Sequence, residues 1–161
     1  MLTQERLKEL LHYDPNTGLF TRLITTSQNA RKGYIAGSLG KRGYVIIWID
    51  GCRYAAHILA WLYIHGVFPK EQIDHKNRIK YDNSLLNLRL ATHAQNVANR
   101  LLLKSNSSGY HGVTWDSINK KWRAQLRFNH CSINIGRFDN IEDAAFAAQI
   151  TRMKLLGEFA P

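Results

Sequence analysis

The sequence predicts an α+β protein built from small antiparallel sheets and a few helices. Three observations support this prediction. Short runs that alternate apolar and polar residues, typical of strands, occur in both halves of the chain. Apolar residues at helical spacing occur near the amino terminus, at 57–65 and at 141–156. A polar, flexible stretch at 104–109 divides the 161 residues into two expected domains, 1–104 and 105–161.

The composition narrows the possible partners. The chain has 22 Lys and Arg against 12 Asp and Glu, and its sequence pI is near 9.9, which favours a polyanionic partner. Nucleic acid is favoured over an anionic membrane, because no basic amphipathic helix with an exposed aromatic face is seen. No apolar run approaches the roughly 18 residues of a membrane-spanning helix, and the amino terminus does not resemble a secretory signal. We expect a cytoplasmic protein, with a monomer favoured over an oligomer.

The first expected domain opens with a helix that runs to about residue 14, with Thr3 as its N-cap. Strands are expected at 19–24, 43–50 and 53–56, and the last two should form a hairpin because Asp50-Gly51 is a strong two-residue turn signal. The two cysteines lie far apart, which argues against a disulfide framework or a structural zinc site. We expect both cysteines in the core, together with all four tryptophans: Cys52, Cys131, Trp48, Trp61, Trp115 and Trp122.

Residues 71–99, EQIDHKNRIKYDNSLLNLRLATHAQNVAN, form a predicted strand, loop, strand and helix, with the helix opening near Thr92. Asp74 and His75 lie where the first strand ends, and Asn96 lies about one turn into the helix. Carboxylate and carboxamide oxygens suit Mg²⁺ or Mn²⁺, and a neutral imidazole can take a proton from water. From Asp74 and His75 alone, an ordinary surface pair is the more frequent explanation.

The ordered set of His75, Asn87 and Asn96, preceded by Asp74, resembles the His-Asn-His (HNH) nucleases. The strings HILAWLYIHGVFPKEQIDHKN and DNSLLNLRLATHAQNVANR carry the resemblance over about residues 57–100. This segment is similar to HNH endonucleases of phages and mobile introns, and the similarity implies the ββα-metal fold and a cytoplasmic location in a bacterial host.

Carried over by residue, this resemblance implies that Asp74 and Asn96 bind a divalent metal, Mg²⁺ or Mn²⁺, and that His75 is the general base. Asn87 would hold the loop that carries His75. The Asn at the last motif position is a departure from His and implies weaker metal binding. Arg89 and His93 are expected to contact DNA. The loop after His75 lacks the Gly that is common in the family.

The second expected domain contains three alternating runs followed by an Ala-rich helix that begins after Asn140. Alternation places Ala124 and Leu126 toward this helix and Arg123, Gln125 and Arg127 on the opposite, open face. Such side chains can read bases in a major groove. An ordinary solvated sheet face is the alternative.

The string SGYHGVTWDSINKKWRAQLRFNHCSINIGRFDNIEDAAFAAQ resembles the APETALA/ethylene-response-factor DNA-binding domain over about residues 107–157. The resemblance implies a three-stranded antiparallel sheet packed on one helix. The residues it implies as DNA contacts, with Arg123 on the same face, are His111, Thr114, Arg123, Gln125, Arg127, Ser132 and Asn134.

Together these features predict a homing-type endonuclease that hydrolyses phosphodiester bonds in double-stranded DNA with a divalent metal. The alternative is a sequence-specific DNA-binding protein with an inactive nuclease domain. A nuclease directed at RNA is disfavoured, because the second domain resembles a reader of duplex grooves and shows no aromatic face for base stacking. Whether one or both strands would be cut stays open.

Overall fold

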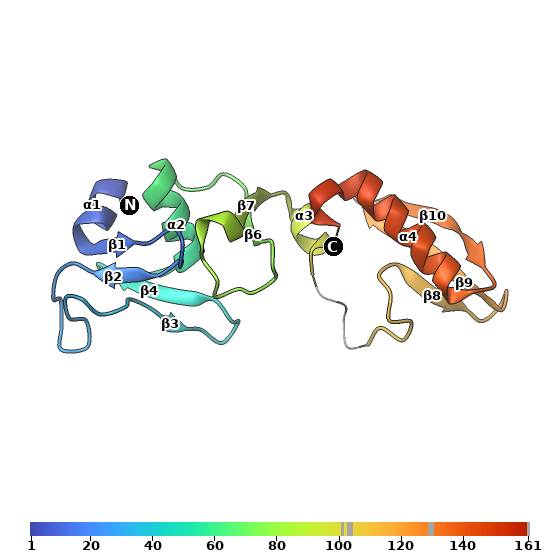
Figure 1. The fold of residues 1–161 in the computed structure, drawn as a ribbon, viewed down its shortest axis with the longest axis horizontal. Helices are drawn as coiled ribbons and strands as arrows, with labels where there is room; N and C mark the ends of the chain where they lie inside the picture. Colours follow the sequence, from blue (N-terminus) through green and yellow to red (C-terminus); the bar gives the residue numbers. More distant parts are fainter. Residues whose placement is uncertain (101, 103–104, 129–130, 161) are drawn as a thin grey trace. The chain divides into compact units, whose positions relative to one another are not determined.

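The computed structural model describes residues 1–100, 102, 105–128 and 131–160. The chain forms two compact units, Met1–Thr92 and His93–Pro161, each built from antiparallel strands and helices (Figure 1). The α+β prediction is therefore confirmed. The expected domain limits, 1–104 and 105–161, stay a prediction.

The first unit opens with helix α1, Gln4–Leu10, which is shorter than expected. Thr3 is its N-cap, since the Thr3 hydroxyl accepts a hydrogen bond from the Arg6 backbone N–H at 3.2 Å. After Leu10 the chain passes directly into strand β1, Leu11–Tyr13, which pairs with β2, Phe20–Arg22. Leu11 and Tyr13 are buried on the same side of β1, so a strand places both in the core.

The second sheet of the first unit has the order β3-β4-β5, with β3 at Ser38–Leu39, β4 at Val45–Ile49 and β5 at Cys52–Ala55. The predicted hairpin between β4 and β5 is confirmed. Its two turn residues, Asp50 and Gly51, have φ values of 47° and 76°, the left-handed conformations that a type I′ turn requires.

Two expected core residues of this hairpin lie on the surface. Trp48 is 62% exposed, and Cys52 is exposed as well. Ile47 and Ile49 of β4 point into the core, and successive strand residues point to opposite faces. Trp48 is therefore placed on the outer face, so the prediction that it is buried was wrong.

Helix α2, Ala56–His65, packs on these sheets and ends at Gly66, which has a left-handed φ of 75°. Leu59, Ala60 and Leu62 of α2 are almost fully buried. They share one hydrophobic core with side chains from α1, β1, β2 and β4: Leu7, Leu10, Leu11, Tyr13, Phe20, Ile47 and Ile49.

The first unit closes with strand β6, Gln72–His75, the short 3-10 helix η1, Leu85–Asn87, and strand β7, Leu88–Ala91. Strands β6 and β7 are antiparallel, with Asp74 opposite Arg89 and His75 opposite Leu88. Helix α3, His93–Ala98, follows and belongs to the second unit. The chain thus has the predicted order of strand, loop, strand and helix.

The second unit contains a sheet of order β10-β9-β8, with β8 at Val113–Asp116, β9 at Lys121–Phe128 and β10 at Cys131–Phe138. Helix α4, Ile141–Leu156, covers one face of this sheet (Figure 1). A short 3-10 helix, η2 at Gly157–Phe159, follows α4. This is the predicted three-stranded sheet with one helix.

The core of the second unit is small. Ala144 and Ala148 of α4 pack on Val113 and Ala124 of the sheet, and the Asn140 side chain caps α4 by accepting the Glu142 N–H at 2.8 Å.

The remaining cysteine and tryptophans, which were also expected in the core, differ in their exposure. Cys131 is exposed and Trp115 is 49% exposed, so the core prediction was wrong for both. Trp61 and Trp122 are partly buried against the cores of their own units. Within the described parts of the chain, no helix is long and apolar enough to cross a membrane.

Candidate active site

Strand β6 carries the two residues that the motif singled out, and both are buried. Asp74 is 5% exposed and His75 is 4% exposed. Successive residues of a strand point to opposite faces, so the carboxylate and the imidazole have different neighbours.

The Asp74 carboxylate forms an ion pair with Arg89, the residue opposite it on β7. Arg89 Nε lies 2.9 Å and Arg89 Nη2 lies 2.8 Å from the same carboxylate oxygen, Asp74 Oδ2. Both side chains are at most 10% exposed. The expected contact of Arg89 with DNA stays a prediction, but in this structure its guanidinium is held by Asp74.

The His75 imidazole lies in a small cluster of rings. Its ring centroid is 5.1 Å from that of His57 and 6.0 Å from that of Tyr44. His75 Nε2 is 3.4 Å from Asn83 Oδ1, a long contact. Burial lowers the pKa of His75 below its ordinary value, and this effect outweighs the opposing influence of Asn83 and Asp74. His75 is therefore neutral at pH 7, as a general base must be.

His57 and Tyr44 complete this cluster, and their rings are 5.1 Å apart. Burial, with a smaller contribution from His75, lowers the pKa of His57 to about 4. His57 is the first residue of the string that carries the HNH resemblance, but the sequence assigned it no role. Tyr44 was missed, because it lies more than 30 residues before His75 and no local pattern marks it.

Asn87 fastens the loop between β6 and β7 to the start of β7. Its side-chain oxygen accepts the Asn77 backbone N–H at 2.9 Å, and its side-chain nitrogen donates to the Asp82 carbonyl at 2.8 Å. The Asn87 carbonyl also accepts the Lys76 N–H at 2.9 Å. The carboxamide therefore satisfies backbone groups on both sides of the loop. Its effect on activity stays a prediction.

The same loop makes its sharp turn without glycine. Arg78 adopts a left-handed φ of 65°, and its N–H donates to the His75 carbonyl at 2.9 Å. Arg78 thus occupies the conformation that a Gly would adopt most easily.

Two further predicted site residues, His93 and Asn96, lie on α3 in the second unit. His93 is exposed and Asn96 is half-buried. Their expected roles in DNA contact and metal binding stay predictions.

The residues expected to contact DNA from the second unit lie mainly on the open face of the sheet. Cross-strand pairing aligns Thr114 with Arg123, Gln125 with Asn134, and Arg127 with Ser132. His111 precedes β8 and lines a pocket of about 210 Å³ that Gln125 and Arg127 also line.

Arg137, which no sequence pattern singled out, also belongs to this face. It lies opposite Arg123, and its Nε is 2.9 Å from Asp116 Oδ2. Lys121, Arg123 and Arg127 are the further cations that β9 contributes.

The β3-β4-β5 sheet carries a groove of about 620 Å³, which no pattern in the sequence predicted. No acidic residue is among the described residues that line it, and Lys41, Arg42 and Arg53 give it positive charge. Tyr44 also lines the groove, so the groove reaches the ring cluster around His75. We call this surface the cationic groove. Its remaining lining residues are Ser38, Leu39, Gly40, Ile46 and Trp48.

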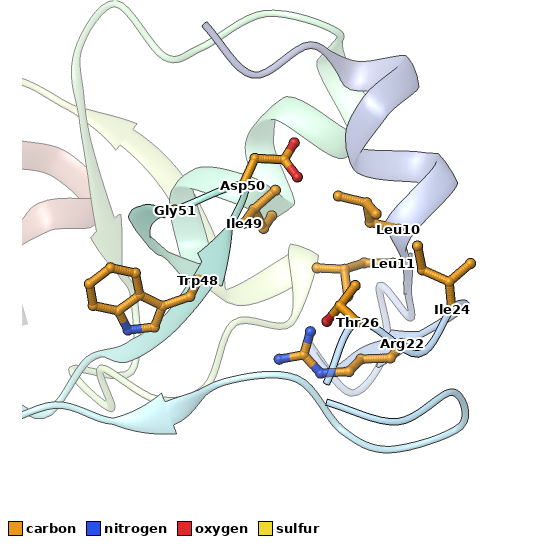
Figure 2. A pocket seen from close by; sticks show the side chains of 9 residues that line it. All are labelled: Leu10, Leu11, Arg22, Ile24, Thr26, Trp48, Ile49, Asp50 and Gly51. Atoms are coloured by element: carbon orange, nitrogen blue, oxygen red, sulfur yellow. The ribbon is translucent and has the colours of Figure 1, made fainter. Parts of the chain in front are cut away.

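A second pocket of the first unit, of about 310 Å³, differs in character. Figure 2 shows its lining side chains, which come from the region of α1, β1, β2 and the turn between β4 and β5. Its acidic group, Asp50, is paired with Arg6 at 3.0 Å. None of the motif residues lines it, so we do not assign it to catalysis.

Among the described residues, no group of three or more His, Cys, Asp and Glu side chains could hold a metal ion. Asp74 nevertheless supplies a carboxylate, a donor that suits Mg²⁺ or Mn²⁺. Because Mg²⁺ is commonly bound by one or two carboxylates while water and phosphate oxygens complete its shell, this residue fits such an ion.

Comparison with known proteins agrees with the motif. Residues 54–98 match the model of an HNH endonuclease family. The chain is 34% identical to protein 3.8 of Escherichia phage T7 over 105 residues, which cover 65% of this chain and 86% of that protein.

The chain is also 34% identical, over 123 residues, to an uncharacterised HNH endonuclease of Acanthamoeba polyphaga mimivirus, covering 76% of this chain and 63% of that protein. Among solved structures, this chain matches one described as DNA binding and cleavage by the HNH homing endonuclease I-HmuI. That match has a TM-score of 0.42 and 25% identity and covers 56% of this chain and 51% of I-HmuI.

Proposed function

The chain carries an HNH endonuclease domain, and from this premise we propose that it hydrolyses phosphodiester bonds in double-stranded DNA with a divalent metal ion. One observation carries the proposal. Strand β6 lies within the segment that matches the HNH family, and it ends with the buried Asp74 carboxylate and the buried, neutral His75 imidazole. Asn87 ties down the loop that follows them.

In the proposed reaction His75 acts as the general base. Its neutral imidazole takes a proton from the water that attacks the scissile phosphate. Contacts with His57, Tyr44 and Asn83 limit rotation of the ring. The ring therefore needs little rearrangement before the proton is transferred.

Asp74 would hold the metal ion, and Asn96 is the second proposed ligand. A bound divalent ion would stabilise the negative charge that develops on the scissile phosphate and on the leaving-group oxygen. Arg89 restrains the Asp74 carboxylate through two donors on one oxygen.

Two surfaces would hold the duplex. The cationic groove presents Lys41, Arg42 and Arg53 to phosphates, which gives affinity without sequence preference. The open face of the second unit presents Arg127 and Gln125, side chains that can read base edges. We propose that this unit acts as the APETALA-type reader that its sequence resembles. We further propose that the protein works as a monomer in the cytoplasm of a bacterial host.

The test is incubation of purified protein with supercoiled plasmid in Mg²⁺, in Mn²⁺ and with chelator. We expect nicked or linear plasmid with metal and none with chelator. The variant His75→Gln separates this activity from a contaminating nuclease, since it should not cleave.

The pairing of Asp74 with Arg89 favours one alternative, a DNA-binding protein whose nuclease unit is inactive, because the guanidinium occupies the expected metal ligand. Retarded migration of a duplex in a gel, without cleavage under any metal condition, would establish this alternative.

A further inference from the structure

Arg89 makes a contact with Asp74 that a strong metal site would not be expected to contain. Both Arg89 donors, Nε and Nη2, converge on Asp74 Oδ2, at 2.9 Å and 2.8 Å. The usual bidentate pairing uses both carboxylate oxygens. Here one oxygen takes both donors, so this contact leaves Oδ1 to other interactions.

The charges around Asp74 explain why this contact matters. A divalent ion bound to Asp74 would lie close to the buried guanidinium, and like charges repel strongly where water is scarce. The two side chains already neutralise each other. Among the described residues, no group of three or more His, Cys, Asp and Glu side chains is placed to hold a metal ion.

A DNA phosphate supplies the missing negative charge. It can ligate the ion directly, and it can accept a hydrogen bond from the guanidinium. Either contact would lower the repulsion between the ion and Arg89. Metal and DNA would then bind more tightly together than separately, and the effect must be reciprocal.

We propose that Arg89 is the internal counter-ion of Asp74, which keeps metal binding weak in the free protein and makes it depend on bound DNA. This inference rests on the proposed function for the identity of the metal ligand. Arg89 is thus a positioning residue: it acts through Asp74, and its effect is on metal affinity.

The experiment measures Mn²⁺ binding to the full chain by the electron paramagnetic resonance signal of free Mn²⁺. His75→Gln is used as the background, because it should prevent cleavage while a short duplex is present. The Mn²⁺ that binds to the duplex without protein is measured separately and subtracted. We expect the duplex to tighten Mn²⁺ binding by on the order of tenfold or more.

Arg89→Gln removes the charge and keeps a hydrogen-bond donor. In the protein without DNA it should tighten Mn²⁺ binding on the order of tenfold, and the gain from added duplex should shrink accordingly. Arg89→Lys keeps the charge and should leave Mn²⁺ binding weak. Arg31→Gln removes one cation from an exposed position and controls for net charge. Asp74→Asn added to Arg89→Gln should abolish the gain.

Two results would overturn the inference. One is the same Mn²⁺ affinity with and without duplex in the His75→Gln protein that retains Arg89. The other is a folded Arg89→Gln variant whose Mn²⁺ affinity without DNA equals that of the protein that retains Arg89. The first needs no Arg89 substitution, so the inference stays testable if Arg89→Gln does not fold. Plasmid cleavage by the unaltered chain is scored separately. Plasmid cleavage without DNA-dependent Mn²⁺ binding refutes only the role of Arg89. DNA-dependent Mn²⁺ binding without plasmid cleavage refutes only the nuclease activity.

Discussion

The candidate active site of the first unit and the open sheet face of the second unit use polar side chains in opposite ways. Asp74, His75 and Asn87 are each less than 9% exposed, whereas Arg127 and Asn134 are exposed. Hydrolysis requires groups that are fixed and partly removed from water, because electrostatic effects are larger there. Reading DNA requires groups that can reach a base edge. Substitutions in the first region should therefore affect stability and chemistry together, and those in the second only binding.

The largest expected effect tests the chemistry of the first region. His75→Gln should lower the rate of single-turnover plasmid cleavage by about 10² to 10⁴, because the general base is lost. His12→Gln, which replaces an exposed histidine of the same unit, should cleave at the original rate. Circular dichroism at the assay temperature must show that both variants are folded. More than half of the original rate in His75→Gln would refute the role of His75.

The second prediction concerns the pH dependence of stability. His57 has a pKa of about 4 in the folded protein, below the ordinary value of 6.5, so the unfolded chain binds the proton more readily between these values. Stability is therefore fully present above pH 6.5 and falls as the pH drops toward 4. The loss from His57 approaches about 3 kcal/mol.

Urea unfolding of the full chain at several pH values, followed by tryptophan fluorescence, measures this loss. Trp48 and Trp61 report on the first unit, and Trp115 and Trp122 contribute the signal of the second. His57→Gln should flatten the pH dependence, and His12→Gln should not. An equally steep dependence in His57→Gln would show that other groups control the acid sensitivity.

The third prediction compares a buried carboxamide with an exposed one. Asn87→Ala leaves the Asn77 N–H and the Asp82 carbonyl without their partner, which should cost about 1 to 3 kcal/mol and reduce cleavage. Asn134→Ala, on the exposed sheet face, should change stability by less than about 0.5 kcal/mol. Thermal unfolding of both variants provides the comparison. Equal losses would erase the distinction between the two regions.

The smallest expected effect lies on the open face of the second unit. If Arg127 reads a guanine edge, Arg127→Ala should weaken discrimination at one or two base positions by about 1 to 3 kcal/mol. Stability and the rate of cleavage on a saturating, non-specific substrate should stay unchanged. Sequencing the cut sites on one long DNA at fixed salt tests this. Identical cleavage maps would indicate that the face is simply solvated.

The sequence predicted best what local chemistry determines. The Asp50-Gly51 hairpin, the caps at Thr3 and Asn140 and the strand, loop, strand and helix order all depend on neighbouring residues. It predicted exposure less well: alternation shows that Trp48 and Ile47 point to opposite faces, but not which face the core covers.

Contacts between distant residues lay beyond sequence reasoning. The ion pair of Asp74 and Arg89 depends on the register of β6 and β7, which no local pattern specifies. Tyr44, which precedes β4, has its ring centroid 6.0 Å from that of His75, a tertiary contact between residues far apart in the sequence. The motif therefore named the proposed reacting groups, while the structure added the side chains that contact them.

The exposed cysteines give this protein a built-in pair of attachment points for spectroscopic labels. The chain has two cysteines in all, Cys52 in the first unit and Cys131 in the second, and both thiols are on the surface. A spin or fluorescent label on each would report the separation of the two units, and any change in it when a duplex is added, without a single substitution.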